Sequence, residues 1–130
     1  MQIGQAAERT GLSIRTLRHY EEVGLVAPSE RSTGGFRLYT EDDISRLMVI
    51  RRMKPLDFTL AEMRQLLDAL DQLRDANSAQ ETRVAAAEVL AGFHQRAQHA
   101  VQRLRKHLDY AEELTNVLAR HSADPEGSGR

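Results

Sequence analysis

Basic side chains gather in the first part of the chain, where their chemistry would be that of polyanion binding. Residues 1–54 contain nine Lys or Arg against seven Asp or Glu, whereas residues 55–130 contain nine against twelve. The formal net charge of the 130 residues is only -1, although one end is slightly basic and the remainder acidic. This asymmetry predicts that any polyanion binds at the N-terminal end.

Few other residues have a type and spacing suited to chemistry. The chain has no Cys, which excludes disulfides, thiolate catalysis and Cys-based zinc sites. His94, His99 and His107 lack the i, i+4 spacing of a helical metal chelate, so we interpret them as solvated or packed imidazoles. Paired carboxylates, a nucleophile with a histidine, and a GxxxxGK phosphate loop are all missing from the sequence. We therefore expect no enzyme activity, no metal and no cofactor.

Two short helices joined by a glycine turn are predicted at the N-terminal end. An apolar stripe begins at Ile3 and is broken at Gly11, after which Ser13 can cap a second helix that ends at Gly24. The buried side of this second helix is predicted to carry Ile14, Leu17, Tyr20 and Val23. The pair is a helix-turn-helix candidate, although the pattern alone fits a generic helical hairpin as well.

A basic β-hairpin is predicted directly after these helices. Residues 32–35 (STGG) form a turn between two short extended pieces. Phe36 and Leu38 alternate with Arg37 and Tyr39, so Arg37 and Tyr39 are expected to share one face. A helix-turn-helix followed by a basic hairpin is a winged helix, whose wing can place an arginine on a phosphate backbone.

Two further helices are predicted to complete a head over residues 1–74. Residues 40–43 (TEDD) and 59–62 (TLAE) have capping-box spacing, and Pro55 and Asp57 separate the helices that they open. Core positions are predicted as Ile44, Leu47, Met48 and Met53 in the first helix, and Met63, Leu66, Leu67, Leu70 and Leu73 in the second.

The remaining chain is predicted to be a linker over residues 75–80, one long helix over residues 81–121 and a disordered tail over residues 122–130. The helix would be about 60 Å long. Its apolar residues repeat at heptad spacing, and the predicted dimer interface comprises Ala97, Val101, Leu104, Leu108, Ala111 and Leu118. The small head cannot cover so long a row of apolar residues, so we infer a homodimer in which a second copy of the helix covers it. The heptad seam formed by these residues does not show whether the two helices are parallel or antiparallel.

Several motifs in fixed order resemble the MerR family of transcription regulators. They are residues 3–7 (IGQAA), residues 10–25 (TGLSIRTLRHYEEVGL), Arg31, residues 35–39 (GFRLY) and residues 56–60 (LDFTL). The resemblance covers about 70 residues and is consistent with an all-α fold with a small β-hairpin wing, joined to a dimerisation helix. In the family that helix forms an antiparallel coiled coil.

The resemblance implies a homodimer that binds an inverted repeat in double-stranded promoter DNA and distorts the spacer DNA to control RNA polymerase. The matching positions for DNA contact are Ser13, Arg15, Thr16, Arg18, His19, Tyr20, Arg31, Gly35, Arg37 and Tyr39. Among them, Arg15 is the candidate for a base-edge contact, whereas Arg18 and Tyr20 match phosphate contacts. Arg51, Arg52 and Lys54 either contact the backbone or only favour a helix C-terminus.

The sequence departs from the family pattern at two positions and leaves one alternative open. Phe36 stands where many members have Tyr, and Asp57 replaces the usual Gly of a turn. The alternative is an architectural or recombination accessory protein that bends DNA. Family sensors of metals use Cys, which this chain lacks, and only a nine-residue tail follows the coil, so neither metal sensing through Cys nor a large ligand domain is expected, and the sequence leaves open whether any effector exists. No apolar run reaches the length of a membrane span, which predicts a cytoplasmic protein without a membrane partner.

Overall fold

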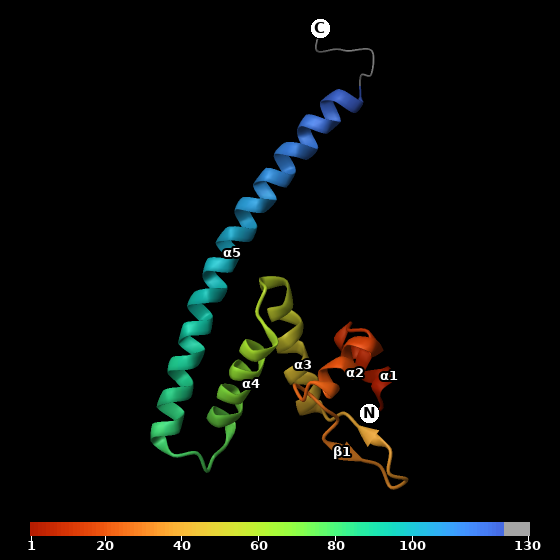
Figure 1. Ribbon diagram of the computed structural model, residues 1–130, viewed down its shortest axis with the longest axis vertical. Helices are drawn as coiled ribbons and strands as arrows, with labels where there is room; N and C mark the ends of the chain where they lie inside the picture. The colour runs from red at the N-terminus through yellow and green to blue at the C-terminus, as the bar shows by residue number, and fades with distance from the viewer. Residues whose placement is uncertain (124–130) are drawn as a thin grey trace. The chain divides into compact units, whose positions relative to one another are not determined.

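The computed structural model describes residues 1–123, so most of the predicted tail, residues 124–130, lies outside the described residues. The elements in chain order are α1 (Ile3–Thr10), α2 (Ile14–Glu22), β1 (Glu30–Arg31), β2 (Arg37–Leu38), α3 (Glu41–Met53), the 3-10 helix η1 (Lys54–Leu56), α4 (Leu60–Arg74) and α5 (Gln80–Ser122) (Figure 1). This order confirms the predicted fold class. The chain divides into two compact units, which meet between Ala91 and Gly92 and are described separately.

Helices α1 and α2 form the predicted helix-turn-helix. Helix α1 ends at Gly11, whose φ of 70° favours glycine, and the Gly11 N–H donates to the Ala7 carbonyl. Ser13 caps α2 by accepting a hydrogen bond of 3.0 Å from the Thr16 N–H. Leu17 and Tyr20 are buried as predicted, but Ile14 is 39% exposed. The expectation for Ile14 is wrong because it is the first residue of α2 and lies toward the outer face.

Strands β1 and β2 pair antiparallel, with Arg31 opposite Arg37. The turn is closed by the Gly35 N–H donating to the Ser32 carbonyl, and Gly35 has a φ of 84°. Strand β2 ends at Leu38, and Tyr39 instead exchanges backbone hydrogen bonds of 2.6 and 2.7 Å with Met1. Tyr39 is only 2% exposed, whereas Arg37 is exposed, although both residues line one cleft.

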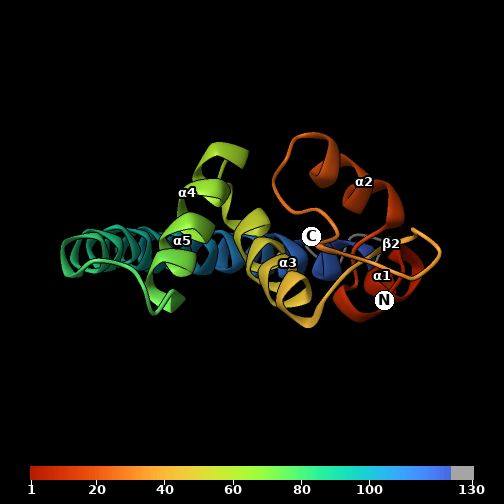
Figure 2. The same cartoon turned by 90° about the horizontal axis from the view of Figure 1, so that it is seen from below.

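Helix α3 forms the centre of the unit that contains residues 1–91. Its capping box joins Thr40 to Asp43, and the buried Asp43 carboxylate also accepts hydrogen bonds from the Ser29 backbone N–H and hydroxyl. Leu47 and Ile50 are fully buried, whereas Met48 is half-buried. The prediction of Met48 as a core residue is therefore wrong, and Ile50 is the residue that packs in the core in its place. Figure 2 shows α1, α2 and the hairpin on one side of α3 and α4 on the other.

Ion pairs join the neighbouring helices to α3, and a second capping box opens α4. Arg9 of α1 pairs with Glu41, and this guanidinium lowers the pKa of the Glu41 carboxyl. Arg46 of α3 pairs with Asp71 of α4. The Thr59 hydroxyl and the Glu62 side chain form the capping box that opens α4, as the sequence predicts. Met63 and Leu67 then pack in the core.

The turn between α3 and α4 depends on Asp57, which has a φ of 65° and a ψ of 27°. Within residues 1–123 it is the one residue other than glycine with a positive φ. Its N–H donates to the Lys54 carbonyl at 3.1 Å, closing η1. This position thus has the left-handed backbone conformation that favours the glycine usual in the family.

Replacing Asp57 by Gly is expected to leave the free energy of unfolding unchanged or to raise it by up to about 1 kcal/mol. Glycine removes the steric cost of the left-handed conformation, but it increases the entropy of the unfolded chain, so the two effects partly cancel. A urea titration followed by circular dichroism measures the change. The control Asp57→Ala keeps the Cβ without the polar group, and we expect it to lose about 1 kcal/mol. A clear loss in Asp57→Gly would contradict the role assigned to this turn.

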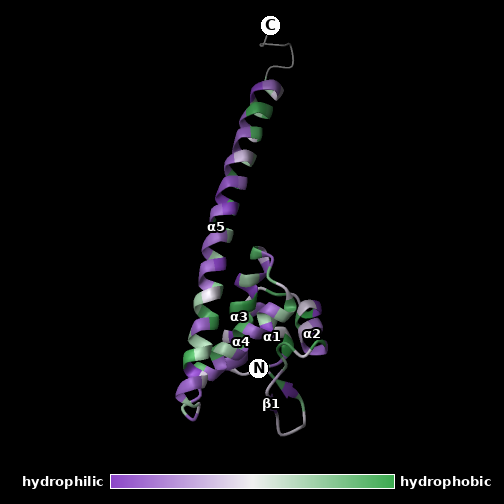
Figure 3. Ribbon diagram, turned by 60° about the vertical axis from the view of Figure 1, so that its left-hand side comes forward, coloured by the Kyte–Doolittle hydropathy of each residue, from purple (hydrophilic) through white to green (hydrophobic). Residues whose placement is uncertain are grey.

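Helix α5 runs for 43 residues and differs from the predicted bounds by one residue at each end. In its first turns Ala86 is buried, within the unit of residues 1–91. Every residue from 101 to 122 is exposed. Hydrophobic residues recur between hydrophilic ones along this part of the helix (Figure 3). Leu104 is 45% and Leu108 is 56% exposed, which leaves the part of the heptad seam from Val101 to Leu118 without a partner in the described residues.

Candidate nucleic-acid interface

The outer face of α2 presents an unpaired basic surface. Ile14, Arg15, Arg18, His19 and Glu22 line one open concavity, at spacings that place them on one side of a helix. Leu17 and Tyr20 occupy the opposite side and pack in the core. Within residues 1–123 the side chains of Arg15 and Arg18 form neither an ion pair nor a hydrogen bond. Helix α2 therefore offers donors outward while its apolar side fixes its orientation.

A cleft of about 410 Å³ separates α2 from the start of α4. Arg15 and Lys54 supply its cations, and Phe58, Leu60 and Met63 are among its apolar residues. Thr16, His19 and Tyr20 complete the lining. Lys54 was predicted only as a possible backbone contact, and the structure brings it beside α2. The signal that could have identified it is its place directly before the turn at Asp57, which leads into α4.

A smaller cleft of about 240 Å³ lies on the other side of α2, toward the hairpin. Arg18 and Arg37 both line it, so the structure brings these two predicted phosphate contacts together. Arg37 also forms an ion pair with Glu21 of α2. A guanidinium has five N–H donors, so this pair leaves others of Arg37 available to a phosphate. The Glu21 contact was not predicted, because its partner is sixteen residues away and no local pattern indicates it.

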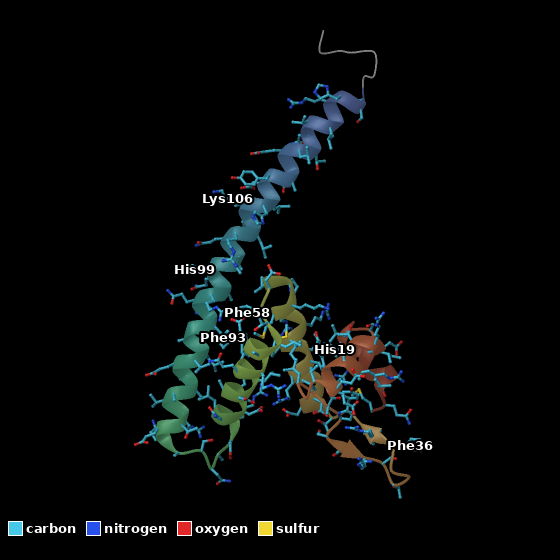
Figure 4. The ribbon with its side chains drawn as sticks, in the orientation of Figure 1. His19, Phe36, Phe58, Phe93, His99 and Lys106 are labelled. Carbon is cyan, nitrogen blue, oxygen red and sulfur yellow. The ribbon has the colours of Figure 1, made fainter. Side chains whose placement is uncertain are left out.

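The far end of the hairpin carries the remaining exposed candidates. Arg31 donates a long hydrogen bond of 3.4 Å to the Gly35 carbonyl, which holds its guanidinium near the turn. Phe36 is 65% exposed, and Figure 4 labels it at the hairpin and His19 on α2. Gly35 contributes its positive φ and not a side chain. The hairpin thus presents two arginines and one aromatic ring to solvent.

The two tyrosines among the predicted contacts are largely buried. Tyr20 is 3% and Tyr39 is 2% exposed, and burial raises the pKa of both phenols. The nearby Glu21 and Asp43 carboxylates raise the pKa of Tyr39 further, against the opposing effect of Arg37. The Tyr39 hydroxyl is buried without a hydrogen-bond partner. Tyr39 is therefore packed at the base of the wing, where it also lines the cleft shared by Arg18 and Arg37, and its DNA contact stays a prediction.

The described residues contain no feature that indicates metal binding or a membrane span. Residues 1–123 contain no group of three or more His, Asp or Glu arranged to hold a metal ion. The same part of the chain contains no helix long and apolar enough to cross a membrane.

A helix-turn-helix followed by a basic wing places the protein in the winged-helix class. Comparison with known protein families then identifies its family. Residues 1–70 match the model described as "MerR HTH family regulatory protein", and residues 44–111 match "MerR, DNA binding". The chain belongs to the MerR family of helix-turn-helix regulatory proteins, as the resemblance of its motifs predicts. This is a family of regulators and not of enzymes.

Three similar proteins illustrate the breadth of this family. A Haemophilus influenzae protein named "Probable heavy metal-dependent transcriptional regulator" is 35% identical over 106 residues, covering 82% of this chain and 81% of that protein. The nodulation protein NolA of Bradyrhizobium elkanii is 44% identical over 73 residues, 56% of this chain, which spans only 33% of that relative. The crystal structure of HiNmlR bound to promoter DNA covers 93% of this chain and 91% of its own, with a TM-score of 0.69 and 21% identity, and supports the fold.

Proposed function

We propose that this protein is a homodimeric transcriptional regulator that binds an inverted repeat in promoter DNA. The observation that carries the proposal is the outer face of α2, where unpaired Arg15 and Arg18 lie between two further cations, Lys54 and Arg37. The major groove of B-DNA is about 12 Å wide and admits one α-helix between two phosphate backbones. A reading helix flanked by a cation on each side matches that arrangement of charge.

The contacts divide into base-reading and backbone-positioning groups. Arg15 is assigned to a guanine edge, since arginine bonds guanine with two parallel donors. Arg18, Arg37 and Lys54 are assigned to phosphates on the flanks of α2, together with Arg31 of the wing. Ser13, Thr16 and His19 are assigned to the major groove because of where their side chains lie on α2 and at its N-terminus. In this assignment residues 1–74 are the DNA-binding head, residues 75–80 the linker and residues 81–121 the dimerisation helix.

The homodimer is supported by the exposed apolar residues of α5. Val101, Leu104, Leu108 and Leu118 are all more than a third exposed, which is unusual for so many large apolar side chains on one helix. The charges of this segment favour antiparallel pairing with a second copy. Arg103, Arg105 and Lys106 precede Asp109, Glu112 and Glu113, so antiparallel pairing sets the basic segment of one copy against the acidic segment of the other.

The size of the seam residues indicates the register of this pair. When the two copies cross at Leu108, Leu104 faces Ala111 of the second copy, and Val101 faces Thr115. Arg105 and Glu112, which are seven residues apart on one flank of the helix, then lie beside each other across the interface. Each large residue meets a smaller one except at the crossing itself, where the two Leu108 side chains meet.

Introducing a single cysteine in place of Leu108 is expected to give a disulfide-linked dimer on mild oxidation, because the two sulfur atoms would meet at the crossing. The chain has no other Cys, so the cross-link reports this position alone. Non-reducing gel electrophoresis measures it. The matched control Leu118→Cys should remain uncross-linked, because in this register the two positions are about 30 Å apart along the coil. Cross-linking of both variants would indicate a parallel pair and contradict the register.

The proposed mechanism is distortion of the promoter spacer, with RNA polymerase as the partner. Two heads joined by a rigid coil hold their half-sites at a fixed separation and twist. If the spacing of the half-sites differs from that preferred by the dimer, the central DNA must bend and untwist, at a cost of a few kcal/mol that contacts at both ends offset. The bending changes the alignment of the promoter elements. The proposed location of this activity is the cytoplasm.

Footprinting of the purified protein on the DNA upstream of its own gene, with and without RNA polymerase, tests the proposed function. Protection of an inverted repeat between promoter elements, with hypersensitive cleavage at its centre, would support it. Extended phased protection that does not engage polymerase would favour an architectural DNA-bending protein instead. Absence of any protected repeat there, and in a pool of DNA selected from random sequences, would contradict sequence-specific binding altogether.

A further inference from the structure

An arginine of α4 closes the C-terminal end of α2. Arg64 donates from Nη2 to the Val23 carbonyl at 2.7 Å and from Nη1 to the Gly24 carbonyl at 2.9 Å. Val23 is the C-cap residue of α2, and Gly24 follows it. The guanidinium thus bonds the backbone that leaves α2, and it does so from a residue forty positions later in the chain.

The last turn of α2 is closed locally by the Gly24 and Leu25 N–H groups, which donate to the Glu21 and Tyr20 carbonyls, and Arg64 adds a contact from outside the helix. The last carbonyls of an α-helix have no partner within the helix and carry a partial negative charge, which a cation stabilises. Helix α2 has only nine residues, and a helix of that length is marginal without tertiary contacts. Two charge-assisted hydrogen bonds from a planar guanidinium therefore fix both the position and the orientation of this end of α2.

Two other arginines make the same kind of contact elsewhere in the described residues. Arg51 of α3 donates to the Thr10 carbonyl at the end of α1, at 2.9 Å. Arg83 of α5 donates to the Leu73 carbonyl at 2.9 Å and to the Asp75 carbonyl at 3.1 Å, at the end of α4. Of these three, Arg64 is the one that holds the helix carrying the unpaired Arg15 and Arg18.

We propose that Arg64 is a positioning residue for DNA reading, an inference that rests on the proposed function. Met63, its neighbour in α4, is buried and lines the cleft beside α2. Helix α4 thus holds the end of α2 through the two hydrogen bonds of Arg64, on the side where Met63 lines the cleft. Together these set the angle at which α2 presents Arg15 and Arg18. Arg64 acts through the backbone of α2 and touches no base or phosphate.

The test compares Arg64→Met, which keeps the apolar stem but has no donors, with Arg64→Lys, which can restore one bond. The matched control is Arg46→Met, which removes the Arg46–Asp71 ion pair between α3 and α4 but no contact with α2. Three quantities are measured for each variant. They are the exchange rate of the amides of residues 23–26 in the free protein, the ratio of affinities for the selected site and for unrelated DNA, and the dependence of affinity on salt.

In Arg64→Met, amide exchange at the end of α2 is expected to be about tenfold faster, and the affinity ratio about tenfold lower. The salt slope should stay unchanged, because no phosphate contact is lost. Arg64→Lys should lie between this variant and the natural chain, and it also serves as the test if Arg64→Met does not fold. Arg46→Met should keep both the exchange rate at residues 23–26 and the affinity ratio.

Three outcomes overturn the inference, and each is distinguishable from the others. An unchanged affinity ratio with faster exchange would make Arg64 a structural cap only. A salt slope reduced by about one unit for each head would make Arg64 a phosphate contact. If the natural chain shows no preferred site, the proposed function fails and the positioning role fails with it, although the exchange data still report whether Arg64 stabilises the end of α2.

Discussion

Replacing Leu104 by Glu is expected to convert the protein to a monomer at micromolar concentration. Leu104 lies in the heptad seam and is 45% exposed in the single chain. In the proposed dimer it packs against the second copy, so the variant would bury two unpaired carboxylates in each dimer. Burying an unpaired charge costs roughly 3 kcal/mol or more, which here applies twice. The dimer dissociation constant should therefore rise by more than about a thousandfold.

The loss of the dimer is expected to reduce affinity for an inverted repeat by at least about a hundredfold, because the two heads no longer bind as one unit. Binding of a single head to unrelated DNA should change little. Sedimentation velocity measures the mass, and a fluorescence anisotropy titration measures the affinity. The control Gln102→Glu introduces the same charge two residues earlier, outside the seam, and should remain dimeric. A dimer that persists in Leu104→Glu would locate the interface elsewhere.

Local signals in the sequence predicted much of the head correctly. Residues 40–43 and 59–62 predicted two capping boxes, and the structure forms both, because each depends on residues three positions apart. The positive φ of Asp57 was indicated by the resemblance, because Asp57 stands where the family usually has Gly. Family motifs in fixed order were sufficient to identify the MerR family, which the comparisons confirm.

Contacts between distant residues were not predictable in the same way. The burial of Tyr39 depends on backbone pairing with Met1, and the capping of α2 depends on Arg64. Neither has a periodic or short-range signature. The Met48 and Ile50 positions differ by only two residues along α3, and the choice between them depends on how α1 and α4 pack against that helix. For the same reason the face shared by Arg18 and Arg37 became evident only from the cleft that both line.

Replacing Arg15 by Ala and replacing Arg37 by Ala are expected to weaken DNA binding in two different ways. Arg15 lies on the outer face of α2 and is assigned to a guanine edge in the proposed complex, so its loss should cost about 1–3 kcal/mol at the selected site and relax the preference at one base pair in each half-site. Affinity for unrelated DNA should fall much less. Arg37 lies on the wing flank, and its loss should weaken binding to all sequences by a similar factor.

The salt dependence of binding separates the two roles. Each phosphate contact releases condensed counterions, so Arg37→Ala should flatten the slope of log affinity against log salt by about one unit for each head. Because the ion pair with Glu21 is also lost, an unpaired carboxylate would remain near the phosphate and add a uniform repulsion. The double variant Glu21→Gln with Arg37→Ala removes that carboxylate and should recover part of the affinity without restoring the slope. Identical behaviour of Arg15→Ala and Arg37→Ala in titrations at several salt concentrations would contradict the division into base-reading and backbone-positioning residues.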